Sequence, residues 1–62
     1  MSAAIAKFLI ELLHGGEDAI EAIEKQMFDE QLTPEQRTGL IDLQTQYENL
    51  SESLRKLIKV HE

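Results

Sequence analysis

Apolar side chains recur through the second half of the chain with alternating steps of three and four residues. This heptad ladder comprises Leu40, Leu43, Tyr47, Leu50, Leu54, Leu57 and His61. A repeat averaging about 3.5 residues places these side chains along one narrow face of a long helix, and such a face must be covered by another helix. The ladder therefore predicts an all-α protein held together by contacts between helices.

The start of this helix is marked by the segment from Leu32 to Gln36. Thr33 suits the N-cap, and Pro34 suits the first helical position, where its missing N–H has no intrahelical partner to lose. Gln36 stands three residues after the threonine, as in a capping box. We therefore expect a helix from residue 34 to about residue 60, preceded by a short turn at residues 32–33.

The first half of the chain contains a second possible boundary, Gly15-Gly16. Two glycines can end a helix, but the apolar pattern keeps its phase across them. Because eighteen residues make five turns of about 3.6 residues, Ile5 shares its direction with Ile23, and Leu9 with Met27. We therefore predict one helix over about residues 3–31, kinked or frayed at the glycines, in preference to two short helices.

Two helices of similar length joined by a short turn predict an antiparallel helical hairpin, one domain over residues 1–62. A chain of 62 residues is near the size at which a single core becomes marginal. Three large apolar residues, Ile10, Phe28 and Ile41, lie away from the main stripes. We expect a homodimer that stacks two hairpins into a four-helix bundle and buries these side chains, with ordinary surface exposure as the alternative.

The composition excludes several functional classes. The chain has no cysteine and two histidines, so a disulfide framework or an ordinary zinc site is not expected. A net charge of -6 argues against attraction to nucleic acid or to an anionic membrane. The apolar N-terminal stretch is interrupted by Lys7 and Glu11, so it is too short to span a bilayer and is expected to be a soluble helix. The expected compartment is the cytoplasm.

Acidic residues gather on the first helix, including Glu17, Asp18, Glu21 and Glu24. Metal sites in helical bundles use inward-facing glutamates with a Glu-x-x-His motif, which this chain lacks, so a solvated acidic face is the favoured interpretation and neither metal nor cofactor is expected. His14 has no candidate nucleophile nearby, so we expect no enzymatic activity.

These features predict a non-enzymatic interaction module, a small acidic dimeric regulator, inhibitor or adaptor that binds another protein through its helix faces. The expected interface residues are Ile10, Phe28, Ile41, Glu17, Asp18, Glu21 and Glu24. The alternative is a nucleic-acid-related regulator: small dimeric RNA-binding hairpins of the Rop type are similar in length and expected architecture, without a shared motif, and an acidic protein can also imitate DNA. A membrane-surface role for the first helix is a third hypothesis.

Overall fold

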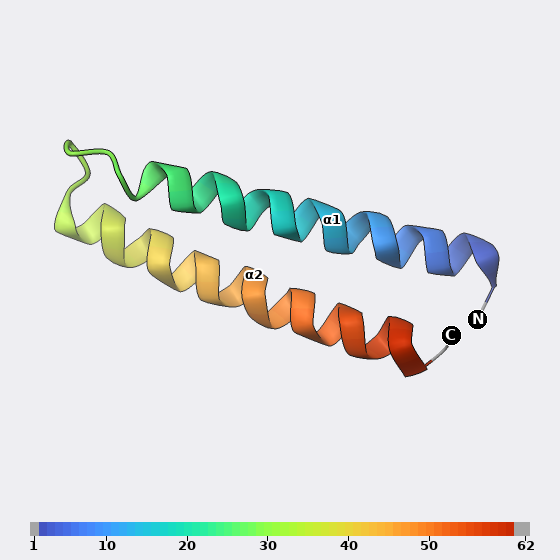
Figure 1. Cartoon of the computed structure of the whole chain (residues 1–62). Helices are drawn as coiled ribbons and strands as arrows, with labels where there is room; N and C mark the ends of the chain where they lie inside the picture. Colours follow the sequence, from blue (N-terminus) through green and yellow to red (C-terminus); the bar gives the residue numbers. More distant parts are fainter. Residues whose placement is uncertain (1, 61–62) are drawn as a thin grey trace.

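A computed structural model describes residues 2–60, which form two antiparallel helices joined by one turn (Figure 1). Helix α1 spans Ala3–Gln26 and helix α2 spans Pro34–Val60, and these residues contain no strand. The Cα atoms extend over 46 × 14 × 11 Å, so the molecule is a single thin layer of two helices. Neither helix is long and apolar enough to cross a membrane. The predicted all-α helical hairpin is confirmed.

Helix α1 continues without interruption through Gly15 and Gly16. It begins after Ser2, whose Oγ accepts a hydrogen bond from the backbone N–H of Ile5 at 3.2 Å. The serine thereby satisfies one of the free amide groups at the start of the helix. The preserved apolar phase on either side of the glycines was thus the correct guide to a continuous helix.

Helix α1 ends at Gln26, so the predicted end near residue 31 is wrong. The backbone N–H groups of Phe28 and Asp29 bond to carbonyls three residues back, which tightens the last turn. The Asp29 carboxylate then accepts the N–H of Gln31 at 2.9 Å, forming a local turn that competes with the helix. The Arg37 guanidinium donates to the Met27 carbonyl at 3.0 Å and satisfies a group exposed by the helix end.

Helix α2 begins with the predicted capping box. The Thr33 hydroxyl accepts the N–H of Gln36 at 3.1 Å, and the Gln36 side chain accepts the N–H of Thr33 at 3.0 Å. Pro34 occupies the first helical position. The boundary is therefore specified by local chemistry alone, independently of packing against α1.

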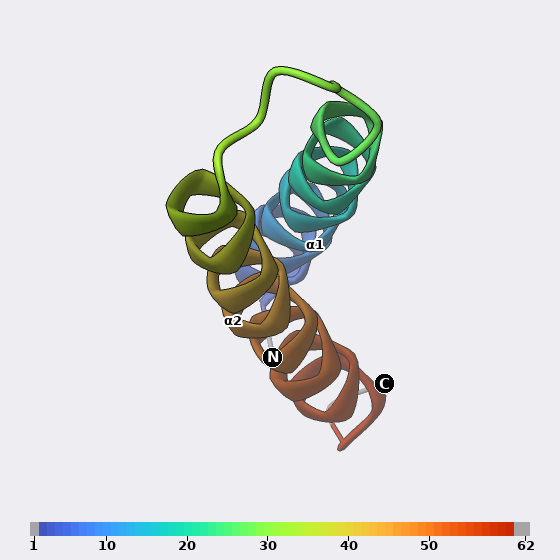
Figure 2. The same cartoon turned by 90° about the vertical axis from the view of Figure 1, so that its left-hand side faces the viewer.

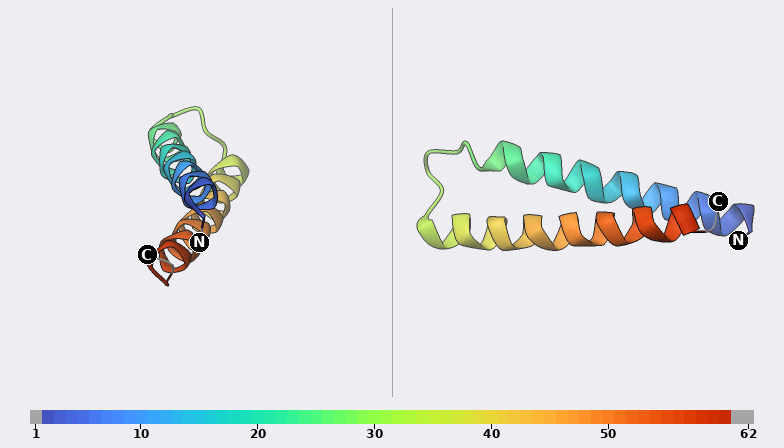
Figure 3. Two further views of the ribbon diagram at one scale, coloured as in Figure 1. Left: turned by 90° about the vertical axis from the view of Figure 1, so that its right-hand side faces the viewer. Right: turned by 60° about the horizontal axis from the view of Figure 1, so that its bottom comes forward.

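The two helices pack through one seam with a seven-residue repeat on each side. Figures 2 and 3 show that the helix axes are inclined to one another along this contact. Every residue of the seam is buried or half-buried: Ala6, Leu9, Leu13, Gly16, Ile20 and Ile23 on α1 with Met27 directly after its end, and Arg37, Leu40, Gln44, Tyr47, Ser51, Leu54 and Ile58 on α2. Steps of three and four on both helices define an antiparallel coiled coil.

The heptad ladder therefore supplies only three of the seven seam residues of α2. Leu40, Tyr47 and Leu54 belong to both the ladder and the seam, whereas Leu43, Leu50 and Leu57 remain exposed. The other seam positions of α2 are Arg37, Gln44, Ser51 and Ile58. His61 lies outside the described residues. Helix α1 covers only part of the ladder, because a single helix covers one side of the line through Leu40, Tyr47 and Leu54.

The centre of the seam is a layer of small residues. A Cβ atom on Gly16 would lie 3.1 Å from the Ser51 hydroxyl oxygen, closer than ordinary van der Waals contact. Ser51 is 2% exposed, and its hydroxyl has no hydrogen-bond partner among the described residues. Glycine against serine thus lets the two backbones approach closely at mid-length, which directs α1 to the serine side of α2 instead of the leucine side.

Candidate functional site

Two flanks border the seam, and their chemistry is opposite. In an antiparallel pair, equivalent positions of the two heptads lie on the same side of the contact. Leu12 of α1 and Leu50 of α2 therefore lie on one flank, together with the residues seven positions away from each. Glu17 of α1 and Arg55 of α2, with the residues seven positions away from each, lie on the other flank. The ion pair between Glu17 and Arg55 joins the two helices on the second flank and confirms this assignment.

The first flank is apolar on both helices. We call it the apolar flank and define it by Ile5, Phe8, Leu12, Leu43, Leu50 and Leu57, all of which are exposed. Leu43, Leu50 and Leu57 recur at seven-residue intervals, as do Ile5 and Leu12. A hollow of about 240 Å³ lies beside this row of leucines, lined by Leu43, Gln46, Tyr47 and Leu50. The flank therefore has both protruding side chains and a depression between them.

The apolar flank also belongs to a wider face that carries no charge, although charged residues make up 29% of the chain. The positions that form this face are Ile5, Phe8, Leu12, Gly15, Ala19, Ala22 and Gln26 on α1, and Gln36, Gly39, Leu43, Gln46, Leu50, Ser53, Leu57 and Val60 on α2. All the charged side chains of the two helices, the seam residue Arg37 apart, project from the other surfaces. Such a broad uncharged surface is typical of one that meets another macromolecule.

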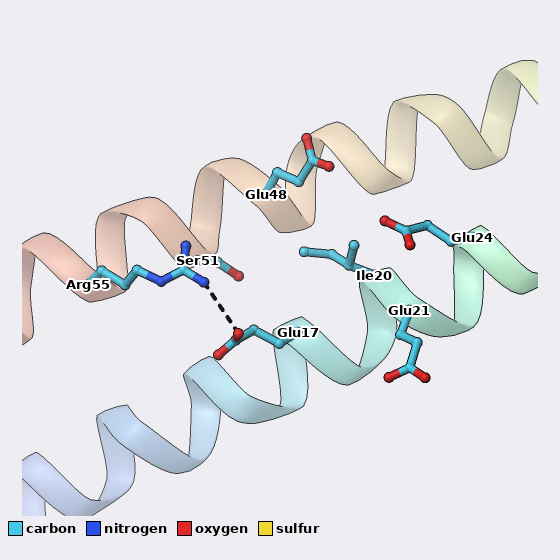
Figure 4. A pocket seen from close by; sticks show the side chains of 7 residues that line it. All are labelled: Glu17, Ile20, Glu21, Glu24, Glu48, Ser51 and Arg55. Atoms are coloured by element: carbon cyan, nitrogen blue, oxygen red, sulfur yellow. Dashed lines mark ion pairs between the residues drawn. The ribbon is translucent and has the colours of Figure 1, made fainter.

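The second flank is acidic. We call it the acidic flank and define it by Glu17, Glu21, Glu24 and Glu48, which line an open cleft of about 350 Å³ together with Ile20, Ser51 and Arg55. Figure 4 shows side chains from both helices around this cleft, with the Arg55 guanidinium drawn toward Glu17. Carboxylates from two different helices therefore concentrate negative charge along one side of the hairpin.

Polar contacts hold several of these carboxylates in place. Arg55 pairs with Glu17 at 3.3 Å across the two helices, and the Gln44 amide donates to Glu24 at 3.3 Å. Lys25 pairs with Glu21 at 3.3 Å one helical turn away. Because these groups are largely exposed, such a pair contributes about 1 kcal/mol or less to stability. Glu48 completes the set, and the flank keeps an excess of negative charge.

The structure separates the residues predicted to form the interface. Ile10 and Ile41 lie on the same side of the seam as the acidic flank, beyond its two ends. The cleft between them is lined by Glu17, Glu21 and Glu24 among other residues. Asp18 lies on the outer surface of α1, directed away from the seam by its heptad position. Phe28 lies in the turn and is 86% exposed. The predicted set therefore includes three of the four glutamates that define the acidic flank, omits Glu48, and omits the apolar flank entirely.

The apolar flank could have been found from the sequence. Leu43, Leu50 and Leu57 are three of the seven members of the heptad ladder, while Gln44 and Ser51 occupy the neighbouring line on the same helix. Comparing the two lines would have shown that α2 presents two possible faces, one leucine-rich and one partly polar. The heptad ladder by itself predicts one narrow face because its members are apolar except His61, and polar neighbours such as Gln44 and Ser51 are not among them.

Acidic and basic side chains of the hairpin pair with one another. Within residues 2–60, no group of three or more histidine, aspartate or glutamate side chains is arranged to hold a metal ion. Two of the basic residues near the open end of the hairpin are already engaged, Arg55 with Glu17 and Lys56 with Glu52 at 3.2 Å. A phosphate backbone would have to compete with these carboxylates.

The fold and its two flanks define a class of protein, the antiparallel two-helix coiled coil with one apolar and one acidic side. Comparisons of the chain with protein-family models, with curated proteins and with solved structures gave no match. The function is therefore argued from the two flanks.

Proposed function

We propose that this chain is a non-enzymatic protein-interaction module, a small acidic homodimer in which two hairpins form a four-helix bundle and bind a basic surface of another protein. One observation supports the dimer most directly. Among residues 2–60, three large apolar side chains are buried and ten are exposed. The buried ones are Leu9, Ile23 and Leu54. So small a core gives a chain of this length little stability without a further partner.

The acidic flank supports the second part of the proposal. Its carboxylates come from both helices and surround an open cleft, so a partner that carries lysine or arginine could approach several of them at once. The interaction would regulate, inhibit or link that partner, since the cleft offers charge and shape instead of reactive groups. The proposed compartment is the cytoplasm, with which the cysteine-free composition is compatible.

Dimer formation makes the stability of the fold depend on protein concentration. We expect sedimentation equilibrium to give twice the 7.1 kDa chain mass at micromolar concentration. We also expect the midpoint of thermal unfolding, followed by circular dichroism, to rise with concentration, because association stabilises the folded state by mass action. A folded monomer with a concentration-independent midpoint would contradict the proposal.

Binding to a basic partner should depend on the carboxylates of the acidic flank. We expect proteins captured from the host extract by the wild-type chain to be lost when Glu21, Glu24 and Glu48 are all replaced by glutamine, and to elute at raised salt because exposed charges are screened. The matched control replaces Glu11, Glu30 and Glu35, which lie outside the cleft, and should capture the same proteins. Equal capture by both triple variants would place recognition elsewhere.

A further inference from the structure

We infer that the second copy of the chain docks on the apolar flank, so that the dimer stacks the two hairpins with their acidic flanks facing outward in opposite directions. This inference rests on the proposed homodimer and assigns its surface. It differs from the interface expected from the sequence, which placed Ile10, Phe28 and Ile41 in the contact. The assignment rests on charge, shape and area.

Charge favours this flank because two copies of the same chain carry the same net charge of -6. Contact through the acidic flank would bring the carboxylates of Glu17, Glu24 and Glu48 against those of the partner, and like charges in an interface are costly. The apolar flank lies in the face to which neither helix contributes a charged side chain, and Asp29 borders this face only at the turn. Two copies can therefore meet there while their charges remain in solvent.

Shape favours the same flank because its surface can complement itself. In a two-fold symmetric contact, each copy offers the same patch, so protrusions and depressions must occur on one surface. Ile5 and Phe8 are each more than half exposed, and the hollow of about 240 Å³ lined by Leu43, Gln46, Tyr47 and Leu50 lies on the same flank. This is the knobs-and-holes arrangement by which helices of a bundle interlock.

Area also fits a second copy. The whole hairpin extends over 46 × 14 × 11 Å between Cα atoms, so a contact along its full length would cover roughly 600 Å² of projected area per copy and roughly 1,200 Å² for the pair, at the lower end of the range of specific interfaces. Burying this face would also cover the leucines of the ladder that α1 leaves exposed. Helix α1 would then pack on one side of Leu40, Tyr47 and Leu54, and the second copy on the other side. The resulting dimer would present two equivalent acidic flanks and could bridge two partners.

The decisive comparison uses Leu12 and Ile10, which are each 41% exposed in the single hairpin but lie on opposite flanks. We expect Leu12→Glu to raise the dimer dissociation constant at least about a hundredfold, because each copy then brings a carboxylate into an apolar contact. Ile10→Glu should change it less than about threefold. Sedimentation velocity over a concentration series measures both values.

A milder pair of variants covers the case in which the Leu12→Glu chain does not fold. Leu50 is 43% exposed and Ile41 is 48% exposed in the single hairpin, and the chain has no cysteine of its own. We expect the thiol of Leu50→Cys to react with Ellman's reagent at least about tenfold more slowly than that of Ile41→Cys when the protein is dimeric, since only the former is covered. Equal rates in the dimer would overturn the assignment.

The outcomes separate this inference from the proposed function. A wild-type monomer would refute the homodimer itself. A dimer that survives Leu12→Glu and dissociates with Ile10→Glu would leave the homodimer intact and place its surface on the acidic flank. A monomer that sediments with phosphatidylcholine vesicles, and loses this property with Leu12→Glu, would show that the apolar flank meets a membrane surface instead.

Discussion

Replacing Leu54 with alanine is expected to remove most of the helical signal of the chain at room temperature. Leu54 is one of the few large side chains that the seam buries, and truncating a buried leucine costs about 2–5 kcal/mol. A single core in a chain of this length supplies only about 3–5 kcal/mol. The loss is therefore comparable to the whole stability of the fold. Circular dichroism at 222 nm with urea titration measures it.

Lys59→Ala is the control for this experiment, because Lys59 lies at the end of the same helix, is exposed and lies outside the uncharged face. Alanine has the higher helix propensity, so this variant should change the unfolding free energy by less than about 0.5 kcal/mol. If Leu54→Ala unfolded with the same midpoint as Lys59→Ala, the burial of Leu54 in the seam would be refuted.

Replacing Gly16 with glutamine is expected to force the helices apart at mid-length. The position faces Ser51 so closely that even a Cβ atom would meet the hydroxyl oxygen at 3.1 Å. Overpacking of this kind costs about 1–3 kcal/mol, and the glutamine amide would also be buried without a partner. Urea unfolding followed by circular dichroism should show a lower midpoint, and the variant should no longer unfold cooperatively if the seam is lost.

The neighbouring glycine provides a matched control. A Cβ atom on Gly15 would meet nothing within 4 Å, and the residue is exposed and helical. Gly15→Gln should therefore stabilise the fold by up to about 1 kcal/mol through helix propensity. Equal stabilisation by both substitutions would show that the helices do not approach closely at Gly16.

Much of the fold could be predicted because its signals are local. Thr33, Pro34 and Gln36 specify the start of α2 through hydrogen bonds within a few residues. The continuity of α1 through the glycines followed from the apolar phase, which no local signal at Gly15 overrides. The predicted end of α1 near residue 31 was wrong because the actual end depends on the Asp29 turn and on Arg37, whose side chain reaches back from α2 to the Met27 carbonyl.

The candidate site was predicted only in part for a similar reason. Acidic residues such as Glu17 and Glu24 could be identified as a cluster from their spacing, but the contribution of Glu48 and Arg55 depends on the register between the helices. The apolar flank was missed because a heptad ladder defines a line of side chains and leaves open which side of that line the other helix covers.

The amino-acid sequence by itself determined two amphipathic helices, the cap that begins the second one and the hairpin that joins them, because periodicity and capping act over a few residues. Packing in three dimensions determined which side of the ladder is buried. The small pair Gly16 and Ser51 lets α1 approach α2 on the serine side, so Leu43, Leu50 and Leu57 stay uncovered. That choice depends on how two helical surfaces fit together, a property that neither helix carries in its own sequence.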